Sequence, residues 1–427
     1  MEPLSLAIPY GTGYEQVVVD GSRVVNILAL THKEGPARTD ELTLISEALK
    51  NPVGSPPLSE LARGQKKVVI LTSDHTRPVP SRLTMPLILA QIRKTSPEAQ
   101  ITIIIGVGCH RSSTPEEIKT KFGEEIFINE RIINHDPLDE TNLVSLGILP
   151  SGGEFRVNRL AVEADLLVAE GFIEPHQFAG FSGGPKSVLP GICAFKTVLA
   201  SHNAEFTVHP KARPGSLDGN PFREDMLFAA RKAGLAFILN VTLNEEKRVS
   251  LAVAGEVEAA HLKGCEYVLS QSSVKAIPAP VVITSNGGYP LDQNIYQSTK
   301  SIMQADLTCQ PGAVIIAVNE CRDGHGSESF LDSFKRASSL EALLEQIESR
   351  QRDETVPDQW VIQLTASILR RRRVIMVTKA EAKDVEALGM KKAATLSEAL
   401  RQAEALIGDP MAPITVLPNA VAMVIRP

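Results

Sequence analysis

The segment ADLLVAEGFIEPHQFAGFSGGPKSVLPGICAFKTVLASHN, residues 164–203, joins a buried strand to a loop rich in reactive side chains. The continuous apolar run at its start is typical of a strand in a parallel sheet that is covered on both faces. The loop carries His176, Lys186 and His202, with the glycine-rich turn 180–184 between the first two. Such a turn can point backbone N–H groups at an anion, and the lysine after it adds a charge or an amine nucleophile. The alternative is a loop with two structural histidines.

Two earlier strand patterns end in polar residues in the same way. Residues 68–72 and 101–107 are continuous apolar runs of the buried-strand type. Asp74 and Arg77 follow the first run, and His110 follows the second. Ligands of open α/β sheets lie at the carboxyl ends of the strands, so we expect these side chains and His176 to share one site.

The second half of the chain repeats the alternation of strands and helices. A link rich in Ser, Pro and Ala at 272–280 precedes strand patterns at 281–284 and 312–318, with a helix predicted over 292–305 between them. The chain is also too long for one hydrophobic core. We therefore predict an α/β protein with two Rossmann-like three-layer αβα domains, residues 1–275 and 276–427.

Composition narrows the class of protein. A net charge of −6 among 427 residues argues against a nucleic-acid or membrane-surface role. The five cysteines are scattered and form no CxxC pair, which indicates reduced cytosolic thiols. No apolar stretch reaches the roughly 18 residues of a membrane span, and no signal peptide is visible at the start. We expect a cytoplasmic protein with no membrane partner.

The sequence matches two nucleotide-binding motifs only in part. Gly106-Val-Gly108-Cys-His-Arg111 begins like a dinucleotide fingerprint, but Arg111 replaces the third glycine, which permits close packing of helix on strand. The turn that ends in Lys186 resembles a phosphate loop, but Pro185 stands where a glycine belongs and has no N–H to donate. An ATP-hydrolysing loop is therefore disfavoured, although a single phosphate on the remaining amides is still compatible.

The histidines suit acid–base chemistry. His110 and His176 each follow a buried strand, where an imidazole can be a structural group or a general base near neutral pH. His202 fits either a single metal ligand or a cation at a helix C-terminus. Arg77 and Lys300 are candidates for holding a carboxylate, with a surface ion pair as the alternative for each.

Several motifs together resemble lactate racemase and its superfamily of nickel-pincer nucleotide enzymes. The resemblance covers nearly the whole chain and is carried by SDHTRP (73–78), GVGCHR (106–111), EPHQFAGFSGGPKSVLPG (174–191), SHN (201–203), SNGGYPLDQNIYQSTK (285–300) and DGHG (323–326).

The resemblance implies a cofactor and a set of roles. The cofactor is a nickel-pincer nucleotide (pyridinium-3-thioamide-5-thiocarboxylic acid mononucleotide nickel), attached to the protein through a thioamide to Lys186, with His202 as the nickel ligand. His110 and His176 match the two acid/base histidines. Further cofactor contacts are expected at Ser182, Gly183, Gly184, Asp74 and Thr76, and substrate contacts at Arg77, Gln297, Lys300, Tyr296 and Trp360. Because these residues come from both halves of the chain, the active site is expected in the cleft between the two domains.

The implied activity is racemisation or epimerisation of a 2-hydroxy acid by transient oxidation. One histidine takes the hydroxyl proton while hydride leaves C2 for the cofactor, and hydride return to the opposite face inverts the centre. Glu174 and Ser327 hint at a pocket polar enough for a sugar acid rather than lactate. The alternatives are a catalytically silent relative that binds nucleotide or metal, and a phosphate-loop enzyme. Cofactor-maturation enzymes are expected partners, and a homo-oligomer is left open.

Overall fold

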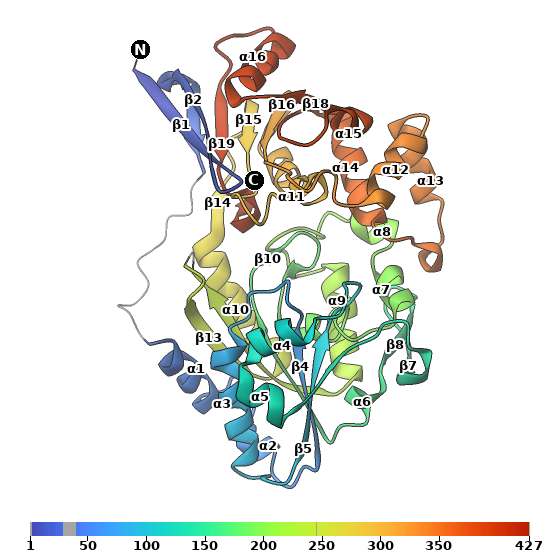
Figure 1. Ribbon diagram of the computed structural model, residues 1–427. Helices are drawn as coiled ribbons and strands as arrows, with labels where there is room; N and C mark the ends of the chain where they lie inside the picture. Colours follow the sequence, from blue (N-terminus) through green and yellow to red (C-terminus); the bar gives the residue numbers. More distant parts are fainter. Residues whose placement is uncertain (1, 29–39, 245, 427) are drawn as a thin grey trace. The chain divides into compact units, whose positions relative to one another are not determined.

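The computed structural model describes residues 2–28, 40–244 and 246–426. The chain divides into two compact units, and the two are described separately below. Unit 1 contains residues 1–31, 271–351 and 355–427, and unit 2 contains residues 32–270 and 352–354. Both units are α/β, with helices packed on a largely parallel sheet (Figure 1).

The described part of unit 2 contains a six-stranded sheet in the order β13-β12-β9-β4-β5-β6. Its central strands carry the apolar runs that the sequence pattern predicts. β4 pairs in parallel with β5 and β9, and only the edge strand β13 runs antiparallel. The strands are β4 (Lys67–Ser73), β5 (Gln100–Gly106), β6 (Arg131–Asn134), β9 (Leu166–Phe172), β12 (Leu235–Leu243) and β13 (Val249–Gly255).

Helices cover both faces of this sheet. Side chains such as Ile70 and Ile103 point to one face and pack with α1 (Glu41–Lys50), α2 (Leu58–Leu61), α3 (Ser81–Arg93) and α4 (Pro115–Phe122). On the other face, Val253 of β13 packs with α10 (Val257–Ser272) and with the loop after β9. The predicted three-layer arrangement is confirmed for this unit. Its remaining elements are α5 (Glu124–Asn129), β7 (Leu143–Ile148), β8 (Glu154–Asn158), α6 (Arg159–Val162), β10 (Pro175–His176), β11 (Gly180–Phe181), α7 (Phe195–Ser201), α8 (Ala204–Thr207) and α9 (Pro221–Lys232).

Unit 1 is built on a second six-stranded sheet, in the order β18-β17-β16-β15-β19-β3 among its described residues. Every pairing in it is parallel. Its strands are β3 (Val24–Ile27), β15 (Ala279–Thr284), β16 (Cys309–Val318), β17 (Arg373–Val377), β18 (Lys391–Ala393) and β19 (Ile414–Leu417). Strands β15 and β16 match the runs expected at 281–284 and 312–318.

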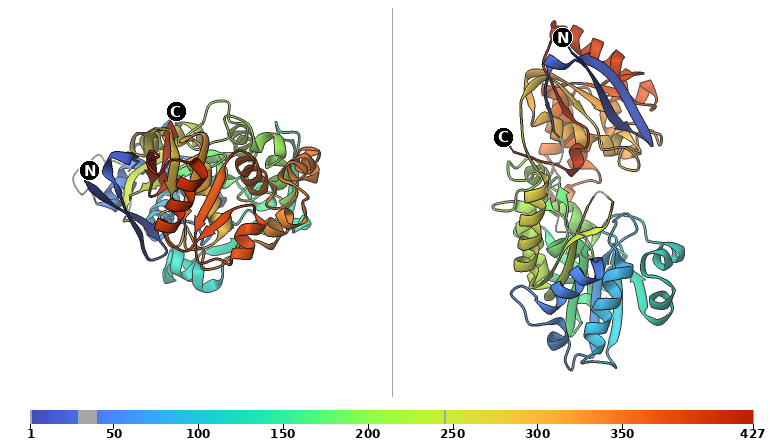
Figure 2. Two further views of the ribbon diagram at one scale, coloured as in Figure 1. Left: turned by 90° about the horizontal axis from the view of Figure 1, so that it is seen from above. Right: turned by 90° about the vertical axis from the view of Figure 1, so that its left-hand side faces the viewer.

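The layers of unit 1 include an N-terminal hairpin. β1 (Pro3–Tyr10) and β2 (Gly13–Asp20) pack beside α16 (Leu396–Ile407), as Figures 1 and 2 both show. Leu6 and Val17 of the hairpin share a core with Ile283 of β15 and with α16. α11 (Ile295–Asp306) also packs on β15 and β16, and α14 (Gln359–Arg371) packs on α11. Other elements are α12 (Glu328–Arg336), α13 (Leu340–Glu348), α15 (Ala382–Ala387), β14 (Ser273–Lys275) and β20 (Val424–Arg426).

The units do not follow two consecutive segments, 1–275 and 276–427. β3 is an edge strand of the unit 1 sheet because it pairs with β19, from the far end of the chain. The change from unit 2 to unit 1 near residue 270 falls within the last turn of α10, close to the predicted link. Pairing between residues so distant in sequence leaves no local signal that a sequence pattern could reveal.

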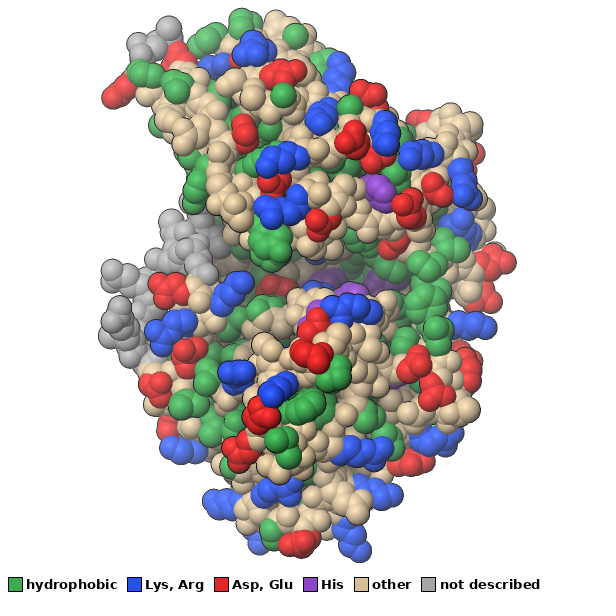
Figure 3. All heavy atoms as spheres, in the orientation of Figure 1, with side chains coloured by type: hydrophobic (Ala, Val, Ile, Leu, Met, Phe, Trp, Pro, Cys, Tyr) green, Lys and Arg blue, Asp and Glu red, His purple; other side chains and the backbone are tan. Residues whose placement is uncertain are grey.

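The surface carries charges of both signs. On the face shown in Figure 3, acidic and basic side chains are interspersed rather than gathered into one patch. None of the helices in the described part of the chain is long and apolar enough to cross a membrane.

Candidate functional site

An Asp–His pair lies at the ends of two neighbouring strands of unit 2. Asp74 follows β4 and is 2% exposed, whereas His110 follows β5 with half of its ring in solvent. The two side chains meet at 2.7 Å between Oδ2 and Nδ1. Burial favours the neutral carboxyl, but the hydrogen bonds from His110 and Thr76 outweigh it and lower the pKa of Asp74 to about 2. Asp74 is therefore an anion that accepts the Nδ1 proton, which leaves the lone pair of His110 on Nε2.

The loop that carries Asp74 is anchored by the buried carboxylate of Glu170. Glu170 of β9 is 1% exposed. It accepts hydrogen bonds from Thr72 Oγ1 at 2.7 Å, from Ser81 Oγ at 2.5 Å and from Thr84 Oγ1. These hydroxyls lie on both sides of the loop 74–80, near the end of β4 and the start of α3. Glu170 thus fixes both ends of the segment that presents Asp74.

His176 has the opposite hydrogen-bonding environment. It lies in β10, which pairs with β11 through His176 and Gly180. Its Nδ1 accepts hydrogen bonds from the backbone N–H groups of Phe178, at 3.3 Å, and Ala179, at 3.2 Å. A ring nitrogen that accepts hydrogen bonds carries no proton, so the neutral ring holds its proton on Nε2.

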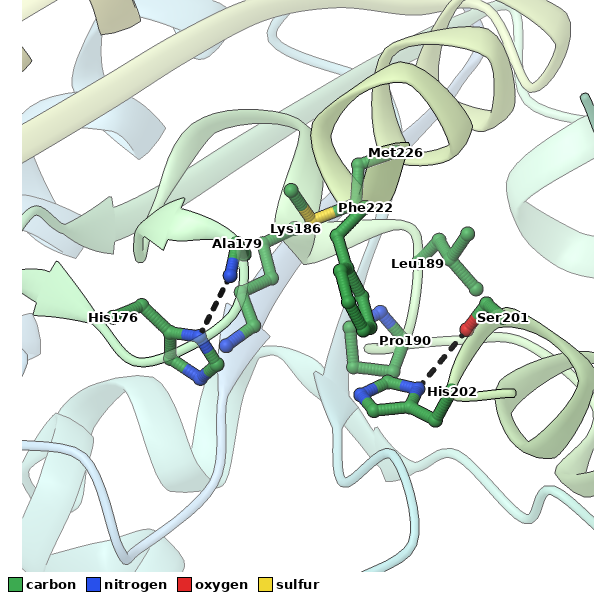
Figure 4. A pocket seen from close by; sticks show the side chains of 9 residues that line it. All are labelled: His176, Ala179, Lys186, Leu189, Pro190, Ser201, His202, Phe222 and Met226. Atoms are coloured by element: carbon green, nitrogen blue, oxygen red, sulfur yellow. Dashed lines mark hydrogen bonds between the residues drawn. The ribbon is translucent and has the colours of Figure 1, made fainter. Parts of the chain in front are cut away.

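His176, Lys186 and His202 line one small pocket. Its other walls are mostly apolar and include Pro190 and Phe222. Figure 4 shows the three side chains facing this pocket from three different segments of unit 2. Lys186 lies in the single 3₁₀ turn 184–187 that follows the glycines, so the sequence element singled out first does bring these groups together.

His202 is presented by the end of a helix as a neutral ring. It is the residue that follows α7, and its Nδ1 donates to the carbonyl of Val198 at 2.9 Å. Burial among Phe222 and Phe178, together with the nearby charge of Lys186, lowers the pKa of His202 to about 4. His202 is therefore not a cation at neutral pH, and its lone pair is on Nε2. This is the form of histidine that binds metals.

The glycine turn uses its own amides inside the protein. Ser182 N donates to Glu174 O at 2.9 Å, and Gly184 N donates to Asn240 Oδ1 at 2.7 Å. Lys186 N donates to Gly183 O at 3.2 Å. Amides committed in this way do not present a row of N–H groups to a phosphate, which argues against the phosphate-loop alternative.

The loop that carries His110 packs on the segment after Lys186. Gly108 N donates to Gly191 O at 3.1 Å. A Cβ on Gly106 would lie 3.0 Å from the same carbonyl oxygen, so these glycines allow two backbones to meet rather than a dinucleotide to bind. The Asp74–His110 pair and the lysine pocket therefore belong to one edge of the unit 2 sheet, as the strand ends predict.

Comparison with known proteins shows which family the chain resembles. Residues 10–215 match the family model of the lactate racemase N-terminal domain, and residues 274–425 match that of the C-terminal domain. The lactate racemase of Thermoanaerobacterium thermosaccharolyticum is 48% identical over 423 residues, which is 99% of each chain. That of Lactiplantibacillus plantarum is 46% identical over 91% of this chain and 92% of its own length. A solved structure of the T. thermosaccharolyticum apoprotein superposes with a TM-score of 0.95 at 47% identity, over 99% of this chain and all of the other.

The chain belongs to the lactate racemase family. It is accordingly an enzyme of the isomerase class.

The remaining residues that family resemblance points to lie in two places. Thr76 and Arg77 are in the loop of Asp74, where Thr76 Oγ1 donates to Asp74 Oδ1 at 2.6 Å. The others belong to unit 1: Tyr296, Gln297 and Lys300 on α11, and Trp360 at the start of α14. Tyr296 packs edge-on against Phe330, with ring centroids 5.6 Å apart. The expectation that the two sets meet in a cleft between the domains stays a prediction.

Three buried polar residues of this lactate racemase homologue were not identified from its sequence. Glu170, Asn240 and His261 contact the loops of the site, yet none is in a recognised motif. For Glu170 and Asn240 the sequence contains a signal, because each interrupts an apolar strand pattern. In the structure each is at most 1% exposed. A polar group in such a place must have a hydrogen-bonding partner, and here the partner is a site loop.

Proposed function

We propose that this protein inverts the C2 centre of a 2-hydroxy acid, with lactate as the first substrate to test. The observation that carries the proposal is the arrangement at one sheet edge of unit 2. A lysine and a neutral histidine line one pocket, with a second histidine beside them and a carboxylate-supported third on the adjoining loop. The names of the relatives, which are lactate racemases, support the same activity.

The residues fit a nickel-pincer nucleotide. Lys186 would hold it through a thioamide and His202 would bind its nickel, because the lone pair of His202 is on Nε2 while its Nδ1–H is held by Val198. Within residues 2–28, 40–244 and 246–426, no group of three or more His, Cys, Asp and Glu side chains is placed to hold a metal ion. A single histidine therefore suits a metal whose other donors come from the cofactor. When bound, this group supplies the acceptor for the C2 hydrogen and its electron pair.

His110 is assigned as the base for one enantiomer. Its Nε2 can accept the proton of the C2 hydroxyl, and the anion of Asp74 stabilises the imidazolium that results. Because half of the ring is exposed, a substrate can approach it from solvent.

His176 is assigned to the opposite face of the substrate carbon. In the neutral ring the Nε2–H can donate a hydrogen bond to a substrate oxygen, since the backbone amides of Phe178 and Ala179 occupy Nδ1. To give up a proton as an acid, the ring must first carry protons on both nitrogens. To transfer a proton at Nε2, as acid or as base, the ring must therefore carry a proton on Nδ1, and the two amide contacts must open. We infer that the turn 176–179 adjusts during each cycle.

Substrate recognition is assigned to groups common to all 2-hydroxy acids. Arg77 and Lys300 would hold the carboxylate, and Gln297, Tyr296 and Trp360 would complete the pocket. The hint of a sugar acid loses its support at Ser327. Its hydroxyl donates to Asp358 at 2.5 Å and caps α12 by accepting Phe330 N, so it serves the fold. Lactate is tested first because the two similar relatives are named lactate racemases.

The deciding experiment uses protein produced together with the cofactor-maturation enzymes. We expect an added mass on Lys186, about one nickel per chain, and formation of D-lactate from L-lactate until the two are equal. Lys186→Ala should lose all three properties. Lys196→Ala, at an exposed lysine on α7, should keep them and is the matched control.

Two outcomes would contradict the proposal. If the mass and the nickel are present but no 2-hydroxy acid of a short, dicarboxylic and sugar-derived panel is epimerised, the protein is a silent cofactor-binding relative. If Lys186 stays unmodified under these conditions, the role of the pocket has been misassigned.

A further inference from the structure

The turn that presents Lys186 rests on two side chains from distant parts of unit 2. Asn240 of β12 is fully buried, and its Oδ1 accepts Gly184 N at 2.7 Å. His261 of α10 is 2% exposed, and its Nε2 donates to Ser182 O at 2.9 Å. One polar contact is made to each end of the tripeptide 182–184, which lies directly before Pro185 and Lys186.

The fit between the turn and these two side chains leaves no spare volume. A Cβ on Gly184 would lie 2.6 Å from Cδ2 and Cγ of His261, and one on Gly183 would lie 2.7 Å from Asn240 Oδ1. Both glycines also adopt positive φ, 75° at Gly183 and 54° at Gly184, which other residues rarely do. The backbone of the turn is thus pressed onto the Asn240 and His261 side chains, and its conformation depends on them.

Each support is itself fixed. Asn240 Nδ2 donates to the carbonyl of Leu239 at 2.9 Å, which determines which end of the amide faces Gly184. Burial lowers the pKa of His261 to about 4, so the ring is neutral, and its proton must be on Nε2 because that nitrogen faces a carbonyl oxygen. Cys265, one turn further along α10, contacts the ring at 3.5 Å.

We propose that Asn240 and His261 are positioning residues for Lys186. By holding Ser182 O and Gly184 N they fix the direction in which the lysine enters the pocket, and hence where its amine meets a cofactor that His202 must also reach. This inference rests on the proposed function, because only a lysine that carries the cofactor needs a turn of fixed conformation. Neither residue is expected to touch substrate or cofactor.

The experiment compares a disruptive with a conservative change at each position. His261→Phe keeps a ring but removes the donor, whereas His261→Gln can place an amide N–H where Nε2 was. Asn240→Leu removes the acceptor, whereas Asn240→Asp keeps an oxygen toward Gly184. Leu58→Ala, at a buried core residue of α2 and outside the turn, is the control for a general loss of stability.

Two measurements are made on each variant. The first is the fraction of chains that carry the added mass on Lys186 after production with the maturation enzymes. The second needs no cofactor: the apoprotein is treated briefly with an acetylating reagent, and the modification of Lys186 is expressed relative to the exposed Lys196 of the same sample. The thermal midpoint is recorded in parallel.

We expect His261→Phe and Asn240→Leu to lower the loaded fraction by about tenfold or more, the scale seen for groups that orient metal ligands. The acetylation ratio should rise several-fold as the amine loses its fixed place. His261→Gln should recover most of both values. Leu58→Ala should lower the thermal midpoint and leave both ratios unchanged.

The inference is overturned if His261→Phe and Asn240→Leu load and acetylate like the wild type, or change only as Leu58→Ala does. A failure of the proposed function gives a different pattern. In that case the wild type itself never acquires the mass, while the acetylation ratio of the apoprotein still reports whether the two side chains hold the turn.

Discussion

The surroundings of His110 and of His176 differ although both rings follow central strands of the same sheet. The Nδ1 of His110 meets a carboxylate, whereas the Nδ1 of His176 meets two backbone N–H groups. A carboxylate stabilises the protonated ring, and N–H donors oppose it. Two residues of one type, expected to perform mirror-image tasks, are thus held in different tautomers before any substrate arrives. At Nε2, His110 therefore offers a lone pair and His176 an N–H donor.

Removing the ring of His110 or of His176 should lower the racemisation rate more than any other change considered below. We expect His110→Gln and His176→Gln each to slow racemisation by about 10²–10⁴-fold, because each removes a proton carrier. Chiral chromatography of lactate checks the rate, and the mass on Lys186 checks that the cofactor is present. If only one of the two variants is impaired, the two-histidine scheme is wrong.

Removing the carboxylate of Asp74 should weaken His110 as a base and leave His176 unchanged. Asp74→Asn deletes a charge-assisted hydrogen bond worth about 1.5–3 kcal/mol, which corresponds to a rate loss of about 10–100-fold. Initial rates at saturating lactate measure the loss. An unchanged rate would show that the imidazolium of His110 needs no anion.

The same variant makes a prediction about acid stability. The folded-state pKa of Asp74, about 2, lies below the value near 3.9 expected in the unfolded chain. Its stabilising contribution is therefore complete above pH 4 and is lost as the pH falls through 2. The wild type should lose about 2 kcal/mol between pH 5 and pH 2 that Asp74→Asn does not lose, as measured by urea unfolding. Asp218→Asn, at an exposed turn, should behave like the wild type.

A smaller effect is expected from the support beneath the Asp74 loop. Glu170→Gln leaves at least one of three buried hydroxyls badly matched, at a cost of about 1–3 kcal/mol in the free energy of unfolding. Racemisation should fall by less than Asp74→Asn causes, because the reacting groups remain. Denaturant titration and initial rates measure the two effects. A greater loss of rate than in Asp74→Asn would make Glu170 part of the chemistry.

The smallest effect should come from the charged neighbour of His110. Arg111 is 59% exposed and forms a bidentate ion pair with Glu117. Exposed pairs of this kind contribute little, so Arg111→Ala should change the racemisation rate by less than about twofold. A large loss in the same rate assay would indicate that Arg111 contacts the substrate.

The sequence predicted those parts of the fold that depend on local patterns. Continuous apolar runs identified β4 and β5 to within one residue at most ends, and their order placed Asp74 and His110 at one edge. The strand expected at the start of the segment 164–203 runs over Leu166–Phe172, because Gly171 and Phe172 continue its pairing with β12. What could not be predicted depends on distant contacts, such as His261 supporting Ser182.

In the candidate site too, residues within local motifs could be predicted, and residues that act through distant contacts could not. Lys186, His176 and His202 were found because they share one short segment and a family motif. Asn240 lies more than fifty residues away from the turn that it contacts, inside a run that reads simply as a strand. A single polar residue within a buried strand is a usable signal for such supports, and Glu170 is the second example in this chain.

The pairing of β3 with β19 has a consequence for how the protein is made. β3 is synthesised before residues 40–270, yet its partner β19 is synthesised long after them. At about 5–20 residues per second, this edge waits for tens of seconds, while residues 40–270 are complete and can fold. A deletion of β3 should therefore damage the sheet of unit 1, which is completed last, and not the sheet of unit 2, which carries Lys186. A fragment spanning 40–270 is expected to fold during translation without the first strands of the chain.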